Sequence, residues 1–367
     1  MQHSIPCVMM RGGTSRGLYF RAADLPQDRA ARDAVLLAAM GSADPTQIDG
    51  AGGATSVTSK VAIVSPSTHK DADVDYLFAQ VGVDSPNVDT APSCGNILAG
   101  VGPFAIENGY VAAQDGETTV RVRNVNTGAM IDCVVQTPNH QVTYEGDTSV
   151  DGVPGTSAPI RLGFRQIAGG KTGRLLPTGK ACDRVCGVDV SCVDLAMPMV
   201  MVAAESLGRT GYESKAALDA DADLLDRLET IRRAAGQLMG LGDVSNSVIP
   251  KIAILAKSRG DSGISSRYFT PGRCHAAHAA TGAICVAGAT RINGTIAHAL
   301  ANGTDDTEIR VEHPGGAIEI GIVTKGFGTA TGIGAAFLTR TARPIFSGQV
   351  FVPQAALAVE PAIQAAA

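Results

Sequence analysis

The chain has 367 residues, 45% of them hydrophobic and 18% charged, a composition typical of a globular protein long enough for two domains. Its net charge of −5 argues against binding nucleic acid or an anionic membrane, since such surfaces carry a basic stripe. Residues 1–11 lack the charged start and apolar core of a signal peptide, and no stretch reaches the ~20 apolar residues that span a bilayer. We therefore expect a cytoplasmic protein, and its charge is still compatible with an anionic small substrate.

The eight cysteines are scattered along the chain, which fits reduced thiols better than a disulfide framework. Cys182, Cys186 and Cys192 lie close enough in sequence to suggest zinc. However, they do not form paired C-x-x-C motifs, and no histidine lies nearby. We expect neither a metal site nor a cofactor.

Local patterns in the first half predict strands around one apolar helix. Gln27 to Met40 reads as a helix capped by Asp24, with Pro26 in the first turn and Gly41 at its end. A hydroxyl-rich loop over residues 47–59 follows, and Lys60 stands where that loop meets a strand. Strands are predicted at 61–64, 75–83, 119–123, 131–137 and 141–145.

The second half repeats this composition after a glycine- and proline-rich zone over 151–187, which we interpret as the crossing between domains. Residues 216–239 form a predicted amphipathic helix with Leu224, Leu228 and Ile231 on one face. A second helix of small residues is predicted over 281–289. Strands are predicted near 191–194, 200–204, 251–256 and 266–270.

Cys94 and Gly95 directly precede small and apolar residues that read as the start of a buried helix extending to Ala105. At such a position the helix dipole favours the thiolate, and free amides can bind a carboxylate or phosphate. The alternative is an inert buried cysteine ahead of a core helix. Thr281 to Ala289 is a weak echo of this segment, so the two helix starts could form anion sockets facing each other across a cleft.

Basic and hydroxyl residues near these helix starts are further candidates. Lys60 is either a general acid or base drawn inward by its apolar strand, or a surface lysine. Thr14 and Ser15 lie in a glycine-rich segment that lacks the lysine of a P-loop and reads as a nest for a carboxylate, or as a plain turn. Arg273 is a candidate carboxylate clamp, and His275 is either a binding or a structural residue.

The sequence contains no G-x-S-x-G elbow and no H-E-x-x-H motif, and no G-x-G-x-x-G follows a convincing strand. Serine hydrolase, zinc protease and dinucleotide-binding interpretations are therefore disfavoured.

Several motifs together carry a resemblance to a known family. Cys94-Gly95-Asn96 resembles the cysteine motif of diaminopimelate epimerase. The chain as a whole is similar to the PrpF branch of that superfamily. The motifs concerned, which extend over nearly the whole chain, are Met10–Gly17, Val57–Lys60, Asp75–Gln80, Cys94–Gly102, Arg123–Gly128, Leu176–Gly179 and Glu312–Pro314.

The resemblance implies an α+β fold of two similar diaminopimelate epimerase-like domains, each a curved mixed sheet around a central helix, with the active site in the interdomain cleft. We place the domains at 1–176 and 177–344, with 345–367 as a segment that could return to the first. The epimerases have a second cysteine in a motif ending Thr-Gly-Ala. Here Thr281-Gly282-Ala283 follows Ala279-Ala280, so the branch's lysine, matching Lys60, is the expected partner of Cys94.

The implied activity is a cofactor-independent allylic proton shift in a small unsaturated di- or tricarboxylate, most like that of 4-oxalomesaconate tautomerase. Isomerisation of aconitate, methylaconitate or methylitaconate is an alternative, and so is a non-catalytic polycarboxylate-binding protein. Lys60 is assigned as base and Cys94 as acid, although the roles could be reversed. A homodimer is left open. The expected substrate-binding residues are Thr14, Ser15, Ser56, Gly95, Asn96, Arg273, His275, Thr281 and Gly282.

Overall fold

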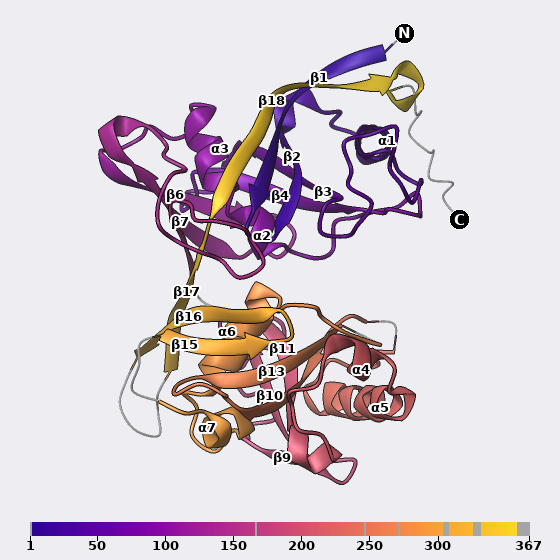
Figure 1. The fold of residues 1–367 in the computed structure, drawn as a ribbon, viewed down its shortest axis with the longest axis vertical. Helices are drawn as coiled ribbons and strands as arrows, with labels where there is room; N and C mark the ends of the chain where they lie inside the picture. Colours follow the sequence, from indigo (N-terminus) through magenta and orange to yellow (C-terminus); the bar gives the residue numbers. More distant parts are fainter. Residues whose placement is uncertain are drawn as a thin grey trace. The chain divides into compact units, whose positions relative to one another are not determined.

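The computed structural model describes residues 2–165, 167–245, 247–270, 272–303, 308–325 and 332–357. The chain divides into a first unit, Met1–Leu162 with Arg340–Ala367, and a second unit, Gly163–Thr339 (Figure 1). The predicted boundaries at 176/177 and 344/345 therefore differ from the observed ones. Residues after Gly163 belong to the second unit because Gly169 donates a backbone hydrogen bond to Asp194, whose own N–H donates to Leu175.

The first unit is built on one mixed sheet. In spatial order its strands are β18, β1, β2, β3, β4, β6 and β7, and only the β2–β3 and β4–β6 pairs are parallel. The bounds are β1 Gln2–Gly12, β2 Ser15–Arg21, β3 Lys60–Pro66, β4 Val74–Val81, β5 Val88–Asp89, β6 Gly116–Asn124, β7 Met130–Thr137 and β18 Ala342–Pro353. β5 is a short strand beside β4, and β8 (Ile160–Arg165) runs across the boundary between the units.

Helix α1 (Arg29–Met40) covers one face of this sheet and buries Val35 and Leu36. Its N-cap is Asp28, whose side chain accepts a hydrogen bond from the Ala31 N–H. The helix ends at Gly41 as predicted, and Gly41 has φ 72°. The predicted cap Asp24 was wrong. Asp24 closes the 3-10 helix η1 (Ala22–Asp24), and its carboxylate pairs with Arg21.

Two other predictions for the first unit need correction. The helix expected from Cys94 to Ala105 is two short helices, α2 (Gly95–Leu98) and α3 (Val101–Glu107). The strand expected at 141–145 is absent from this described segment. The extended chain of β7 stops there because the 3-10 helix η2 (Pro138–His140) contains positive φ angles, 55° at Asn139 and 60° at His140.

The second unit is also a mixed sheet, in the order β9, β10, β11, β12, β13, β15, β16 and β17. Its strands are β9 Asp183–Val185, β10 Val188–Leu195, β11 Met197–Ala203, β12 Lys251–Lys257, β13 Ile264–Thr270, β14 Arg273–Cys274, β15 Glu308–His313, β16 Gly316–Lys325 and β17 Gly332–Arg340. The 3-10 helix η3 (Ala204–Leu207) follows β11, and η5 (Gln354–Leu357) follows β18 in the first unit.

The helix predicted over 216–239 is interrupted. It forms α4 (Lys215–Asp219) and α5 (Ala222–Leu238), because the Asp221 side chain accepts a hydrogen bond from the Leu224 N–H and starts a new helix. Helices α6 (Ala280–Ala289) and α7 (Ile296–Leu300) complete the unit. None of the helices that the structure describes is both long and apolar enough to cross a membrane.

The two units repeat one topology. Along the chain, β1–β2, β3–β4 and β6–β7 are antiparallel, whereas β2–β3 and β4–β6 are parallel. β10–β11, β12–β13 and β15–β16 are likewise antiparallel, and β11–β12 and β13–β15 are parallel. In each unit helices occupy the two parallel crossovers, first α1 or α4–α5, then α2–α3 or α6–α7. The second half thus duplicates the architecture of the first.

The cap assignment can be tested by stability. Asp28→Ala removes the acceptor for the Ala31 N–H, so we expect the free energy of unfolding to fall by about 1 kcal/mol in urea titrations. Asp24→Ala breaks only an exposed pair with Arg21 and should cost less than about 0.5 kcal/mol. A larger loss for Asp24→Ala than for Asp28→Ala would contradict the assignment.

Candidate active site

Lys60 is the first residue of β3, where it pairs with Gln80 of β4 on one side and Gly17 of β2 on the other. Its Nζ donates a hydrogen bond of 2.6 Å to Gln80 Oε1. The same nitrogen lies 5.0 Å from the centroid of the Phe78 ring. The half-buried amine is therefore held between an amide oxygen and an aromatic face, which together restrict its position.

The Gln80 side chain is itself fixed in one orientation. Its Nε2 donates hydrogen bonds of 2.8 Å to the Ser59 carbonyl and 3.1 Å to the Ser56 carbonyl. Because both amide protons are directed at carbonyls, the oxygen of the amide must face Lys60. The 3.1 Å bond also ties the carbonyl of the predicted binding residue Ser56 to the same Gln80 amide that holds Lys60. Our sequence interpretation gave Gln80 no role, although it closes the Asp75–Gln80 motif.

Cys94 occupies the N-cap position of α2 in an extended conformation, and its side chain is half-buried. Its carbonyl accepts hydrogen bonds from the Leu98 N–H at 3.0 Å and from the Tyr76 hydroxyl at 3.3 Å. Burial raises the pKa of Tyr76 well above its ordinary value, and negative charge on Cys94 raises it further. Tyr76 therefore remains a neutral donor that anchors Cys94 to β4.

The strand β4 connects Cys94 and Lys60. Tyr76, Phe78 and Gln80 alternate along β4 and so lie on one face of the sheet, with about 13 Å between the first and last Cα atoms. Tyr76 contacts Cys94, whereas Phe78 and Gln80 contact Lys60. The structure thus brings the two predicted catalytic residues to the same face of the first unit's sheet.

The predicted nest at Thr14 lies against Asn96. Asn96 Nδ2 donates a hydrogen bond of 2.9 Å to Thr14 Oγ1, and Arg340 Nε donates one of 3.3 Å to Asn96 Oδ1. Gly13 has φ 49°, and a Cβ there would overlap Asn96 Oδ1. Ser15 is buried at the start of β2. The Asn96 side chain therefore holds this turn. The backbone N–H groups of Gly95 and Asn96 have no partner within α2, so they are candidate ligand donors.

Three of the four candidates of the second unit, Thr281, Gly282 and His275, lie near the start of α6. Thr281 Oγ1 donates to Met197 Sδ at 3.5 Å, and Gly282 lies so close to the Tyr268 ring that a Cβ would overlap it. His275 Nδ1 accepts a 3.0 Å hydrogen bond from the Ala277 N–H. Arg273 is exposed on β14. Gly282 and His275 thus lie beside Tyr268, whose ring centroid is 5.9 Å from that of His275. Thr281 and the Tyr268 hydroxyl both donate to the Met197 sulfur.

His278 in the same segment is a structural residue. Burial lowers its pKa to about 3, and its ring nitrogens lie 3.0 Å from Ser266 Oγ and 3.1 Å from the Ala279 carbonyl. Across the described residues no group of three or more histidine, cysteine or carboxylate side chains could hold a metal ion. Cys182 and Cys186 are exposed, whereas Cys192 is buried.

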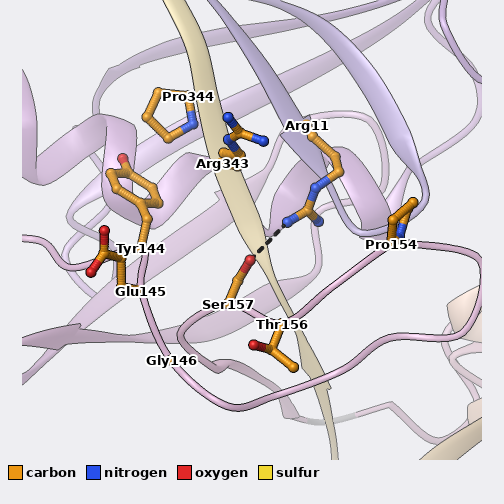
Figure 2. A pocket seen from close by; sticks show the side chains of 9 residues that line it. All are labelled: Arg11, Tyr144, Glu145, Gly146, Pro154, Thr156, Ser157, Arg343 and Pro344. Atoms are coloured by element: carbon orange, nitrogen blue, oxygen red, sulfur yellow. Dashed lines mark hydrogen bonds between the residues drawn. The ribbon is translucent and has the colours of Figure 1, made fainter.

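A separate open pocket of about 560 Å³ lies in the first unit, between the loop carrying Tyr144 and Ser157 and the strands carrying Arg11 and Arg343 (Figure 2). None of the predicted catalytic or binding residues lines it. Arg11 Nη2 donates to Ser157 Oγ, and Nη1 donates to the carbonyls of Gly13 and Thr341. Because these donors are used within the protein, we assign Arg11 to holding the turn at Gly13 rather than to ligand binding.

The orientation of Gln80 gives a prediction. Gln80→Met removes the acceptor for Lys60 and leaves the carbonyl of the buried Ser59 without its 2.8 Å side-chain donor. We expect the free energy of unfolding to fall by about 1–3 kcal/mol in urea titrations. Gln136→Met, which removes an exposed bond to Glu117, is the matched control and should stay within about 0.5 kcal/mol. Equal losses would show that the Gln80 network does not stabilise this region.

Comparison with known proteins identifies the family. A family model described as PrpF protein matches residues 2–353. The 4-oxalomesaconate tautomerase of Pseudomonas putida is 50% identical over 353 residues, which cover 96% of this chain and 97% of that protein. A crystal structure of methylitaconate-delta-isomerase is 40% identical, with a TM-score of 0.85 and 98% of each chain covered.

A crystal structure of a hydroxyproline epimerase from Agrobacterium vitis shares the fold at 12% identity, with a TM-score of 0.52 and coverage of 95% of this chain and 92% of that one. The predicted α+β fold of two similar epimerase-like domains is therefore confirmed. The isomerase and tautomerase names of the nearer relatives agree with the predicted enzyme class. The chain belongs to the PrpF family.

Proposed function

We propose that this PrpF protein is a cofactor-independent isomerase that shifts a proton, and with it a double bond, in a small unsaturated di- or tricarboxylate. The observation that carries the proposal is the placement of Lys60 and Cys94 on one face of the same sheet, each anchored to β4. An amine and a thiol are both able to exchange protons with carbon acids when suitably positioned. Two such groups are what an allylic shift needs.

In the proposed reaction, Lys60 removes a proton from the substrate carbon next to the double bond. The electron pair of that C–H bond enters a dienolate, and Cys94 donates its thiol proton to the far carbon. The products are the isomer, an ammonium and a thiolate, and proton exchange with solvent restores the starting state. The Phe78 ring, 5.0 Å from Nζ, stabilises the ammonium that the first step forms. The reverse assignment of the two roles remains the alternative.

Carboxylates and the developing enolate require hydrogen-bond donors. The backbone amides of Gly95 and Asn96, and those of Thr281 and Gly282 in the first turn of α6, have no partner within their helices. We assign them to binding substrate, with side chains of Thr14, Ser15, Ser56, Arg273 and His275 around them. That residues of both units act on one substrate is part of this proposal.

For the substrate we favour 4-oxalomesaconate, by overall similarity to the tautomerase of Pseudomonas putida. Methylitaconate is the second candidate because a solved methylitaconate-delta-isomerase has a TM-score of 0.85 to this chain. Aconitate and methylaconitate are further alternatives of the same chemistry. A cytoplasmic location belongs to the same proposal, and so does the absence of nucleic-acid partners, which the net charge of −5 supports.

The catalytic assignment is tested by proton exchange. In deuterated buffer, NMR should show that the wild-type protein introduces deuterium into at least one acid of a panel containing 4-oxalomesaconate, methylitaconate and aconitate. Lys60→Met removes the base and should lower this rate at least about 100-fold, and Cys94→Ser should lower it at least about 10-fold.

Lys70→Met, at an exposed lysine of the first unit, is the matched control and should keep the wild-type rate. Exchange at the full rate in Lys60→Met would exclude the mechanism. Binding of these acids to the wild type with no exchange or isomerisation would instead favour the non-catalytic binding protein.

We also infer a homodimer through β18. This strand exposes Ile345, Phe346 and Phe351 at 50%, 48% and 59%, and its residues 344–353 include no charged side chain. Uncharged strands with large exposed apolar residues are typical of interfaces between chains. Two antiparallel copies related by a two-fold axis at Gly348 would place Ile345 opposite Phe351 and Phe346 opposite Val350. No like charges would face each other in this arrangement, so β18 can pair with the β18 of a second copy.

Light scattering after size exclusion tests the dimer. We expect twice the 37.5 kDa chain mass for the wild type and the monomer mass for Phe351→Glu, because the introduced charges would be buried. Leu238→Glu, at a similarly exposed apolar residue of α5, should stay dimeric. A monomeric wild type, or a dimeric Phe351→Glu protein, would refute this interface.

A further inference from the structure

The duplicated topology assigns a counterpart to Lys60. The parallel pair β4–β6 begins at Val74 and the equivalent pair β13–β15 begins at Ile264. Six residues further along each strand stand Gln80 and Thr270. Gln80 pairs with Lys60, and continuing the β12–β13 register from Ile252↔Phe269 by one residue pairs Thr270 with Lys251.

The other neighbouring strand gives the same result. Lys60 is the first residue of β3 to pair with β2, opposite Gly17, and Lys251 is the first residue of β12 to pair with β11, opposite Met199. Two independent registers therefore make Lys251 equivalent to Lys60. Our sequence interpretation assigned Lys251 only to a strand.

The two lysines also point to equivalent faces. Val61 and Ile63 of β3 pack in the core beneath α1, and Ile252 and Ile254 of β12 pack in the core beneath α5. Side chains alternate along a strand, so Lys60 and Lys251 both lie on the opposite face. In the first unit that face carries Tyr76 and the Cys94 helix. In the second unit it carries Tyr268, which packs on Gly282 of α6.

The surroundings of Lys251 favour the binding of an anion. Its side chain is half-buried, and within the part of the chain that the structure describes no hydrogen bond or ion pair engages its Nζ. Its strand neighbours Met199 and Thr270 are uncharged. Burial of Lys251, and after it the positive charge of the fully buried Arg232 of α5, lower the pKa of Lys251 to about 8. Within the described ranges its positive charge thus has no acidic partner, unlike that of Lys215, which pairs with Asp219.

We propose that Lys251 is a second functional lysine, which binds a carboxylate of the polycarboxylate substrate as an ammonium. The proposal rests on the proposed function, in which residues around α6 bind substrate. A substrate carboxylate would supply the negative charge that no described side chain places beside Lys251. The duplicated position would then serve proton transfer in the first unit and charge recognition in the second.

Ligand binding tests this assignment without requiring turnover. The probe is propane-1,2,3-tricarboxylate, a saturated tricarboxylate with no double bond to move, titrated by calorimetry into the intact protein. Lys251→Met should weaken binding about 10- to 100-fold, as expected for a lost charge-assisted hydrogen bond. Lys251→Arg should retain most of the affinity. Lys257→Met, at an exposed lysine on the last residue of β12, is the matched control and should bind like the wild type.

The pH dependence separates binding from a structural role. The ammonium of Lys251 is present below about pH 8 and is lost above it, so wild-type affinity for the probe should fall as pH rises through this range. Lys251→Arg stays charged and should not show this fall. In the isomerase assay, Lys251→Met should raise KM more than it lowers kcat.

The outcomes distinguish this proposal from the proposed function. If the wild type isomerises no acid of the panel but binds the probe through Lys251, the proposed reaction fails and the lysine assignment stands. If the wild type isomerises an acid and Lys251→Met binds the probe with unchanged affinity, the lysine assignment fails and the reaction stands. If affinity falls with pH in Lys251→Arg as it does in the wild type, the assignment of Lys251 is also overturned.

Discussion

The pairing of β3 with β4 is the constraint on which the first unit's site depends. It puts Lys60 opposite Gln80, and two carbonyls of the preceding loop fix the amide of Gln80 so that its oxygen accepts the lysine N–H. Four residues back along β4, the Tyr76 hydroxyl donates to the carbonyl of Cys94. A shift of this register by one residue would turn Gln80 and Tyr76 to the other face of the sheet. Lys60 and Cys94 would then lose the side chains that anchor them to β4.

The duplication explains how one architecture can provide two different surfaces. Both units place a lysine at the start of the same strand and a helix in the same crossover, yet their contacts differ. Lys60 has an acceptor and an aromatic ring, whereas Lys251 has a buried arginine nearby and, among the residues that the structure describes, no acceptor. Cys94 precedes α2, while Cys285 of the second unit is completely buried inside α6, where burial raises the pKa of its thiol above the usual range. Among the described cysteines, Cys94 is thus the one that stands at the start of a helix.

The sequence was sufficient for the family, the fold class and the positions of most elements, because alternation, glycine stops and extended motifs are local signals. It failed where two local solutions competed. Asp24 and Asp28 both precede α1, and only the three-dimensional turn at η1 decides that Asp28 caps it. Likewise, the interruption of the predicted helix at Asp221 depends on a side chain capping the backbone, which periodicity does not register.

The candidate site was predicted in part for the same reason. Lys60, Cys94 and Thr14 were proposed as candidates because they stand in or next to loops and helix starts with distinctive composition. Gln80 and Tyr76 were not given roles, since a polar residue closing a strand and a tyrosine within one look ordinary until the pairing register is known. Lys251 could be identified only from the structure, because its equivalence to Lys60 follows from the strand pairing of the two units. We recognised no sequence similarity between the two segments.

In the proposed reaction two different groups, Lys60 and Cys94, handle the departing and the arriving proton. This division of roles is tested most directly with a substrate deuterated at the allylic carbon and turned over once in ordinary water, followed by NMR of the product. Two groups predict a product in which the double bond has moved and the deuterium is absent from the far carbon, since that proton comes from the thiol. Transfer of the deuterium to the far carbon in the same turnover would mean that one base carries it across, and would rule out separate roles for Lys60 and Cys94.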